Sequence, residues 1–258
     1  MAARARLYAL PLIVLAALLA LALLRRAADG PPVPPAKLFP YGALRVGIDP
    51  SNPPFAVLNG NNLSGMDVDI ANELGKRLDL PVQFVFLGYD GLYDSLKSDQ
   101  TDALIAGLTI DLTRLNDVHY SQPYFNAGLV LVSDQGLAAM TDLPGHSLAY
   151  EFGSEADTQA RDWLRRILPF ATKPYELPTD ALDAARLGDA NAALVDAVSA
   201  RLYLRAHPDW KPNLNYVTDN LYAVATQARR PEISVAVNDA LQSMIDDGTL
   251  NQIINRWL

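Results

Sequence analysis

Hydrophobic and polar positions in the first half of the chain follow two alternating periods. Short runs of period two, typical of strands, are separated by segments whose apolar residues recur every three to four positions, as on one face of a helix. Val68, Ala71, Leu74 and Leu78 follow the helical spacing. Alternation of strand and helix predicts a parallel sheet covered by helices. The expected elements are the strand Leu44–Ile48, the helix Gly65–Leu80, the strand Val82–Leu87, the short helix Asp90–Lys97 and the strand Asp102–Leu108.

The same alternation begins again in the second half of the chain. It predicts a second lobe of similar design, followed by a last strand and two C-terminal helices that are interrupted at Asp247-Gly248. The expected elements are the strand Ser147–Phe152, the helix Ala156–Ile167, a short strand, the helix Thr179–Leu187, the strand Ala192–Val195, the strand Leu221–Thr226, and two helices within Pro231–Leu258.

The lobes are expected to be connected by two chain crossings. After the first forty residues, the chain is long enough for one large domain or for two lobes of about 100 residues each. The crossings are placed near Val130–Ser133 and Val217–Leu221, which assigns 41–130 and 221–258 to lobe 1 and 131–220 to lobe 2. Two crossings make a hinge, so we expect a two-lobed α/β fold that can open and close.

The N-terminal segment has the pattern of a membrane-targeting signal. Leu7–Leu24 is an uncharged apolar run that would extend about 27 Å as a helix, close to the hydrocarbon thickness of a bilayer. Basic residues flank both ends, and no small-residue cleavage site follows the run, so 1–28 is interpreted as a signal anchor, with a cleaved signal peptide as the alternative. The proline-rich residues 29–40 are predicted to form an extended linker.

Charge changes the picture of possible partners. The sequence has 21 basic and 29 acidic residues, and five of the basic but only one of the acidic residues precede Tyr41. The rest of the chain therefore has a formal net charge of −12. Such an acidic body repels phosphate backbones, so nucleic-acid binding is not expected. It mildly favours a cationic ligand.

Cysteine and histidine limit the possible chemistry. The sequence contains no cysteine, which excludes thiol nucleophiles, disulfides, thiolate metal sites and lipidation of an N-terminal cysteine. The three histidines, His119, His146 and His207, are scattered without the spacing of metal ligands. We therefore expect no metal site and no cofactor.

From Leu44 to Leu258 the chain resembles the family 3 periplasmic solute-binding proteins, the polar-amino-acid receptors of ABC importers, which have the type II periplasmic-binding fold. The resemblance rests on these stretches, in order: LRVGIDPSNPPF (44–55), LSGMDVDIANELGKRL (63–78), YDGLYDSLKSDQTDALIAGLTIDLTR (89–114), YSQPYFNAGLVLV (120–132), FGSEAD (152–157), ALVDAV (193–198) and DDGTLNQIINRW (246–257).

This resemblance implies a monomeric extracytoplasmic binding protein rather than an enzyme, with an amino-acid-like ligand and an ABC permease as partners. It also implies residue roles. The residue at Arg114 would bind the α-carboxylate of the ligand, and the one at Asp196 its ammonium group. Thr109 and the Gly107 carbonyl would bond the same two groups. Arginine suits this role because its planar guanidinium bonds a carboxylate bidentately.

One position departs from the family pattern. Gly153-Ser154 lies between a strand and a helix of the second lobe, where free backbone N–H groups favour an anion. Family members usually place Thr or Ser directly after this pair, but this chain has Glu155. Its carboxylate either caps its own helix, which we favour, or enters the site and pairs with Arg114. In the second case the ligand would lack a standard α-carboxylate.

Selectivity for the ligand side chain is expected from residues around the first strand and the start of the second lobe: Asp49, Asn52, Phe55, Tyr89 and Glu151. An acid at position 49 would bond a cationic or amide side chain, and the two aromatic residues would wall the site. Core packing is an equal alternative for both aromatic residues. The pattern predicts a basic or amide-bearing amino acid as ligand.

Two other classes of function stay open. One is a sensory module that signals to a separate protein. The other is an enzyme on the same fold, since periplasmic dehydratases resemble these receptors. An enzyme would need an acid or base in the cleft, and Glu151 and Glu155 are the candidates.

Overall fold

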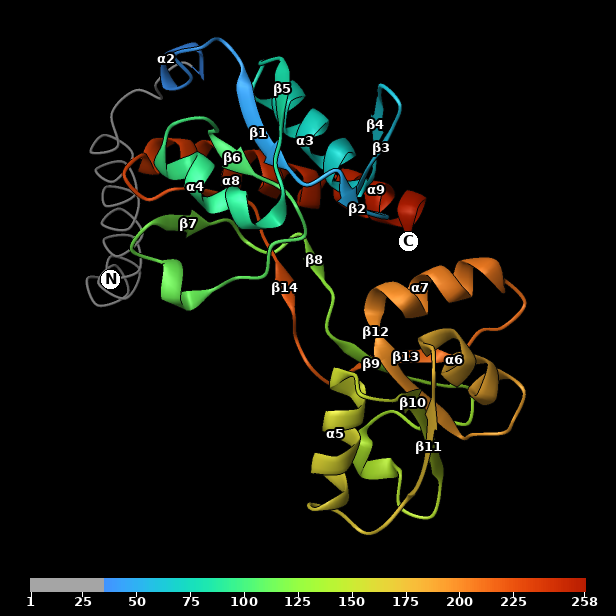
Figure 1. Ribbon diagram of the computed structural model, residues 1–258. Coiled ribbons are helices and arrows are strands. Elements are labelled where there is room, and N and C mark those ends of the chain that lie inside the picture. Colours follow the sequence, from blue (N-terminus) through green and yellow to red (C-terminus); the bar gives the residue numbers. More distant parts are fainter. Residues whose placement is uncertain (1–34) are drawn as a thin grey trace, which may run out of the picture.

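The computed structural model describes residues 35–258, and these form two α/β lobes (Figure 1). Lobe 1 contains a five-stranded sheet of order β5-β1-β6-β15-β7. Its first strand, the predicted run of alternating residues, is buried along its whole length. The strands are β1 (Leu44–Ile48), β5 (Val82–Phe86), β6 (Ala103–Leu104), β7 (Val118–Tyr120) and β15 (Ala225–Gln227).

Helices and a small sheet complete lobe 1. The amphipathic segment after β1 folds as α3, whose buried face includes Val68, Ala71 and Leu74, so the predicted helix is confirmed. The helices are α2 (Pro35–Leu38), α3 (Met66–Arg77), η1 (Tyr89–Gly91), α4 (Leu92–Lys97), η2 (Leu112–Arg114), α8 (Pro231–Asp246) and α9 (Thr249–Trp257), and the small antiparallel sheet has the strands β2 (Ser51–Asn52), β3 (Ala56–Asn59) and β4 (Asn62–Ser64).

Lobe 2 repeats this design with a sheet of order β11-β10-β12-β9-β13. The strands and helices predicted between residues 147 and 196 are all present. The strands are β9 (Leu129–Ser133), β10 (Ser147–Glu151), β11 (Ala171–Tyr175), β12 (Ala192–Asp196) and β13 (Asn213–Tyr216), and the helices are η3 (Met140–Asp142), α5 (Glu155–Leu164), α6 (Pro178–Arg186) and α7 (Ala197–Ala206).

Both large sheets are mixed, which corrects the prediction of a parallel sheet. The three strands linked by helices are parallel in each lobe, as expected. In contrast, β15 runs antiparallel to β6 and β7, and β9 runs antiparallel to β12 and β13. Because β9 and β15 enter their sheets from the hinge and not through a helical crossover, nothing requires them to be parallel.

Two predicted strands are shorter than expected. The strand expected over Asp102–Leu108 pairs only at Ala103–Leu104, after which the chain leaves the sheet and turns at Gly107 with a φ of +59°. The strand expected over Leu221–Thr226 is divided into β14 (Leu221–Tyr222) and β15. The first of these breaks places residues 105–109 outside the ladder, where they are free to build a site.

The hinge is a two-stranded antiparallel sheet of β8 (Phe125–Asn126) and β14. Both strands run between the lobes in Figure 1. Since β9 already pairs with β12 at Leu129, the first crossing lies before the expected range Val130–Ser133. Gly128 lies at this crossing, where a Cβ atom would stand 2.0 Å from the Thr218 carbonyl oxygen of the second crossing. The two crossings are therefore in close backbone contact.

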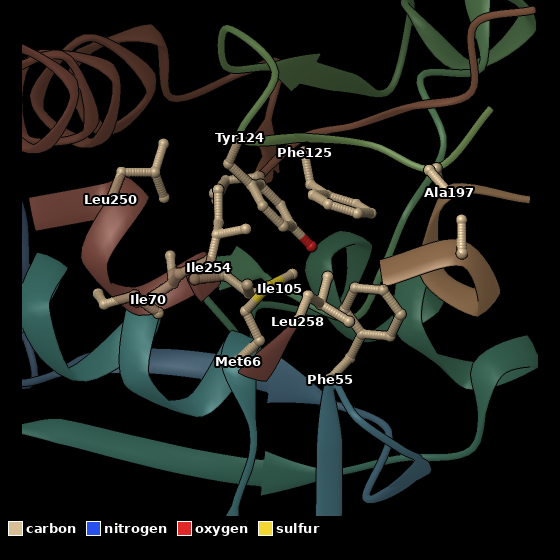
Figure 2. Packing of buried hydrophobic residues seen from close by; sticks show 14 of the residues in the cluster. Phe55, Met66, Ile70, Ile105, Tyr124, Phe125, Ala197, Leu250, Ile254 and Leu258 are labelled. Atoms are coloured by element: carbon tan, nitrogen blue, oxygen red, sulfur yellow. The ribbon is translucent and has the colours of Figure 1, made fainter. Parts of the chain in front are cut away.

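The largest cluster of buried apolar side chains continues from lobe 1 through the hinge into lobe 2. Figure 2 shows Phe55, Met66, Ile105, Tyr124 and Phe125 in this core, with the Tyr124 hydroxyl pointing inward. The rings of Phe55 and Phe125 meet edge-on, with 6.1 Å between their centroids. The aromatic contacts connect the hinge strand β8 to the turn that follows β2.

The predicted anchor, 1–28, and most of the linker lie outside the described residues. The last linker residues form the short helix α2, and Phe39 is fully buried in the core of lobe 1. Residues 35–40 therefore belong to the folded body and do not form an extended linker. Among residues 35–258, no helix is long and apolar enough to cross a membrane.

Candidate functional site

The lobe 1 half of the site is a cavity of about 780 Å³ between η1, α4 and η2. It brings together Tyr89, Thr109 and Arg114, three residues that the sequence analysis selected. Tyr89 is half exposed and contributes its ring to the wall. The other lining residues are Asp90, Tyr93, Asp94, Ile110, Asp111, Leu112 and Thr113.

Arg114 is held from two sides at the end of η2. Its Nε donates to Asp111 Oδ2 at 3.1 Å, and its guanidinium carbon lies 4.1 Å from the centre of the Tyr93 ring. The Asp111 carboxylate also accepts from the Thr113 N–H, which caps this short helix. The two terminal amino groups of Arg114 have no acceptor among residues 35–258. They are the part of the guanidinium fork that can bind a carboxylate.

Gly107 and Thr109 connect this half to the hinge. The Thr109 hydroxyl donates to Asn220 Oδ1 at 2.7 Å, and Thr109 pairs with Tyr222 in an isolated β-bridge. A Cβ atom at Gly107 would lie 3.3 Å from both Asn52 Nδ2 and the Tyr222 ring. Asn220 and Tyr222 are contacts that the sequence analysis missed. Residues 217–221 were expected only as a crossing between the lobes. A polar Asn220 two positions before the aromatic Tyr222 was a sign that this crossing could also contact the site.

The residues proposed for side-chain selectivity separate into two groups. Asp49 and Asn52 are half-buried, and Asn52 lies next to the Gly107 turn. Asp49 Oδ1 already accepts from the N–H and the hydroxyl of Ser51, at 3.0 and 2.6 Å. Phe55 is only 4% exposed, and its ring packs against Tyr222 with 5.4 Å between centroids. Phe55 thus packs in the core and does not form a wall, because the chain after β2 turns it inward.

The lobe 2 half is a smaller cavity of about 120 Å³ at the N-terminal ends of α5 and α7. It brings Glu151, Ser154, Glu155 and Asp196 together. Three of these are carboxylates, so this half is acidic. The other lining residues are Leu129, Ala156, Pro178, Leu194 and Val195.

The start of α5 differs from the expected arrangement. Its cap is Ser154, whose Oγ accepts from the N–H groups of Ala156 and Asp157, so the cap is not Glu155. The Gly153 N–H, expected to be free for an anion, donates to Asp157 Oδ2 at 3.0 Å. Asp157 also pairs with Arg161, and this pairing holds the pKa of Asp157 below its usual value. The exposed Glu155 occupies the first turn of α5, where the helix dipole favours its charge.

One carboxylate oxygen of Asp196 has a structural role, and the other is free to bind. It is the N-cap of α7, where its Oδ1 accepts from the Ser199 N–H at 2.9 Å. Its other oxygen has no hydrogen-bond donor within the described part of the chain. The pKa of Tyr222 is raised, first by burial and then by the charges of Asp196 and Asp67. The charge of one carboxylate from each lobe, Asp67 of lobe 1 and Asp196 of lobe 2, therefore acts on the Tyr222 hydroxyl.

The two cavities share no lining residue. Arg114 belongs to lobe 1 and Asp196 to lobe 2, so a ligand that contacts both would bridge the lobes. A zwitterion matches this pair, since Arg114 offers a guanidinium and Asp196 a carboxylate. No three His, Cys, Asp or Glu side chains between residues 35 and 258 are grouped so that they could hold a metal ion.

Curated proteins with similar sequences are solute receptors. The chain is 24% identical to the arginine-binding extracellular protein ArtP of Bacillus subtilis over 79% of this chain and 81% of that protein. It is 27% identical to the L-cystine-binding protein TcyJ of Escherichia coli over 84% of this chain and 82% of that protein.

A solved structure of an ancestral cationic amino acid solute binding protein has a similar fold. The TM-score is 0.63 at 26% identity, over 86% of this chain and 98% of that one. In a second solved structure, that ancestral protein is named as a precursor of cyclohexadienyl dehydratase. The model of the bacterial extracellular solute-binding proteins, family 3, matches residues 44–258. The chain therefore belongs to the bacterial extracellular solute-binding proteins of family 3.

Proposed function

We propose that this chain captures an amino acid with a basic or amide-bearing side chain between its lobes. The observation that carries the proposal is a pair of free bonding groups of opposite charge: the terminal amino groups of Arg114 lie on lobe 1, and one carboxylate oxygen of Asp196 lies on lobe 2. Three carboxylates line each cavity, which supports a ligand with an additional positive charge. The names of similar proteins that bind arginine and cationic amino acids support the same class.

Ligand binding would work by closing the hinge. Charge-assisted hydrogen bonds stabilise by about 1.5–3 kcal/mol each, so bonds to both lobes form a large part of the roughly 8 kcal/mol of a micromolar site. Only the closed arrangement lets one ligand make both sets of bonds. The ligand therefore shifts the equilibrium between open and closed lobes, and no covalent bond is made or broken.

The closed form would be the one that an ABC permease recognises. The family is described as extracellular, and the names of two similar Escherichia coli proteins, both ABC transporter arginine-binding proteins, support delivery to a transporter. Attachment to the membrane through 1–28 and a monomeric state are part of this proposal. The apolar run Leu7–Leu24 supports the attachment.

A second function has one observation in its favour: the similar ancestral binding protein is described as a precursor of cyclohexadienyl dehydratase. In that case Glu151 or Glu155, which line the lobe 2 cavity, would supply the acid or base. Turnover of a prephenate-like substrate by the purified chain would establish it. The receptors among its relatives favour binding without turnover.

A thermal-shift screen of the full chain tests the proposal. The ligands are the twenty amino acids, polyamines and small organic acids, because a compound that binds only the native state raises the melting temperature. We expect shifts with arginine, lysine, histidine or glutamine. If a carboxylate-free amine shifts the melt while no α-amino acid does, Arg114 does not bind a carboxylate.

A further inference from the structure

The most deeply buried charged residue among residues 35–258 lies at the start of α3. Asp67, in the first turn of α3, is completely buried, and its carboxylate has no ion-pair partner among residues 35–258. A buried carboxylate without a cation is costly, because burial removes water from the charged form. Some other interaction must compensate for it.

Two hydrogen bonds hold the Asp67 carboxylate. Its Oδ2 accepts from the Gly107 N–H at 2.7 Å, and its Oδ1 accepts from the Tyr124 hydroxyl at 2.9 Å. Both donors are neutral, and burial outweighs them, so the pKa of Asp67 is raised to about 7. The inward-pointing Tyr124 hydroxyl is visible in Figure 2. Asp67 is therefore poised between its two protonation states near neutral pH.

Charged groups on the neighbouring elements are engaged elsewhere. On α3 and α9, Arg256 pairs with Asp69. At the other end of α3, Arg77 pairs with Glu73 and with Asp247, which follows α8. Tyr222 of the hinge is the other titratable group close enough to interact with Asp67. Within the described chain, no cation neutralises this carboxylate.

Gly107 brings Asp67 close to the lobe 1 cavity, because Thr109, two residues further along the chain, lines that cavity. Its N–H faces Asp67, and its backbone, in the left-handed region, is confined by Asn52 and Tyr222. The resemblance to family members assigns the carbonyl of the same residue to the ammonium group of the ligand. A ligand cation at that carbonyl would lie close to the buried carboxylate, separated from it by one residue of backbone.

We propose that Asp67 is a positioning residue that orients Gly107 and supplies the counter-charge for the cationic group of the bound ligand. This inference rests on the proposed function. Attraction between the two charges is strengthened by the low polarity of the core. By linkage, a ligand that favours the ionised form of Asp67 must lower its pKa and release a proton on binding.

The coupling between ligand binding and the ionisation of Asp67 determines the direction and the size of the pH dependence of affinity. Asp67 is largely protonated in the free protein below pH 7, and ligand binding favours its ionised form, so affinity increases as the pH rises. If binding lowers the Asp67 pKa by about one unit, affinity increases about tenfold between pH 5 and pH 8, and about 0.4 proton is released per ligand at pH 7.

Isothermal titration calorimetry of the full chain with arginine, in phosphate and in Tris at pH 7, measures this proton release. We expect it in the wild type and not in Asp67→Asn, which keeps the size and an acceptor for Gly107 but cannot titrate. Asp67→Asn should also bind about tenfold more weakly at pH 8. Asp69→Asn, the same change two residues along α3, should leave the proton release unchanged.

Tyr124→Phe provides a second variant that keeps the carboxylate. Removing the hydroxyl takes away a bond to the ionised form, so the pH dependence of binding should move to higher pH. Binding of arginine without proton release, or with equal release in Asp67→Asn, would overturn the inference and leave the proposed function intact. Failure of the wild type to bind any compound of the screen would instead overturn the proposed function, and this inference with it.

Discussion

At the scale of single residues, the site combines an expected pair with unexpected surroundings. Arg114 and Asp196 have free bonding capacity in the two cavities, as their residue types suggested. Their neighbours were not predictable from local sequence. Asp67 follows the ordinary pattern of an acid in a first helical turn, and its complete burial, with hydrogen bonds from Tyr124 and Gly107, arises from contacts distant in sequence.

Glu155 gives a residue-scale prediction. Its exposed carboxylate lines the acidic lobe 2 cavity, so it attracts the cationic group of the ligand and also stabilises the start of α5. Glu155→Ser should weaken arginine binding by about 1 kcal/mol, or about fivefold in Kd. The same change should lower the free energy of unfolding by about 0.3–1 kcal/mol. Calorimetry and urea unfolding measure the two effects.

Glu232→Ser is the matched control, because Glu232 lies in the first turn of α8 and lines neither cavity. It should lose similar stability with no change in affinity. Tighter binding in Glu155→Ser would mean that the Glu155 carboxylate repels the carboxylate of the ligand instead.

At the scale of elements, hydrophobic periodicity was sufficient to place most strands and helices in both lobes. It was insufficient for strand direction, since β9 and β15 look like any buried strand, and their antiparallel pairing depends on how the chain returns from the hinge. It also overestimated the strand after Asp102. The apolar run continues to Leu108, but Gly107 turns the backbone out of the ladder to meet Asp67.

The hinge gives an element-scale prediction. Because a Cβ atom at Gly128 would stand 2.0 Å from the Thr218 carbonyl oxygen, Gly128→Ala must separate the two crossings. We expect a loss of about 1–3 kcal/mol in the free energy of unfolding, the usual cost of overpacking. Urea unfolding followed by tryptophan fluorescence measures the change.

Gly88→Ala serves as the comparison, since a Cβ atom there would meet no other atom within 4 Å. Its stability should stay close to that of the wild type. Equal stability of the two variants would show that the crossings do not need their close backbone contact.

At the scale of the whole molecule, the proposed function depends on two bonding groups of opposite charge, Arg114 on lobe 1 and Asp196 on lobe 2. The body of the protein is acidic, and its two cavities lie on opposite sides of a hinge of two short strands. A ligand with a carboxylate and a cationic group can join them only when the lobes approach. The resemblance of the sequence to a receptor family predicted this design, whereas the volumes and linings of the cavities required the structure.

Calorimetric titration of arginine into the wild type, Arg114→Ala and Asp196→Ala tests this account most directly. Each substitution should weaken binding by about 10- to 150-fold, the equivalent of the charge-assisted bonds that it removes. Arg165→Ala and Asp162→Ala, which break an exposed ion pair on α5 outside both cavities, should bind as the wild type does. Unchanged affinity in either Arg114→Ala or Asp196→Ala would contradict the claim that the ligand joins the two lobes.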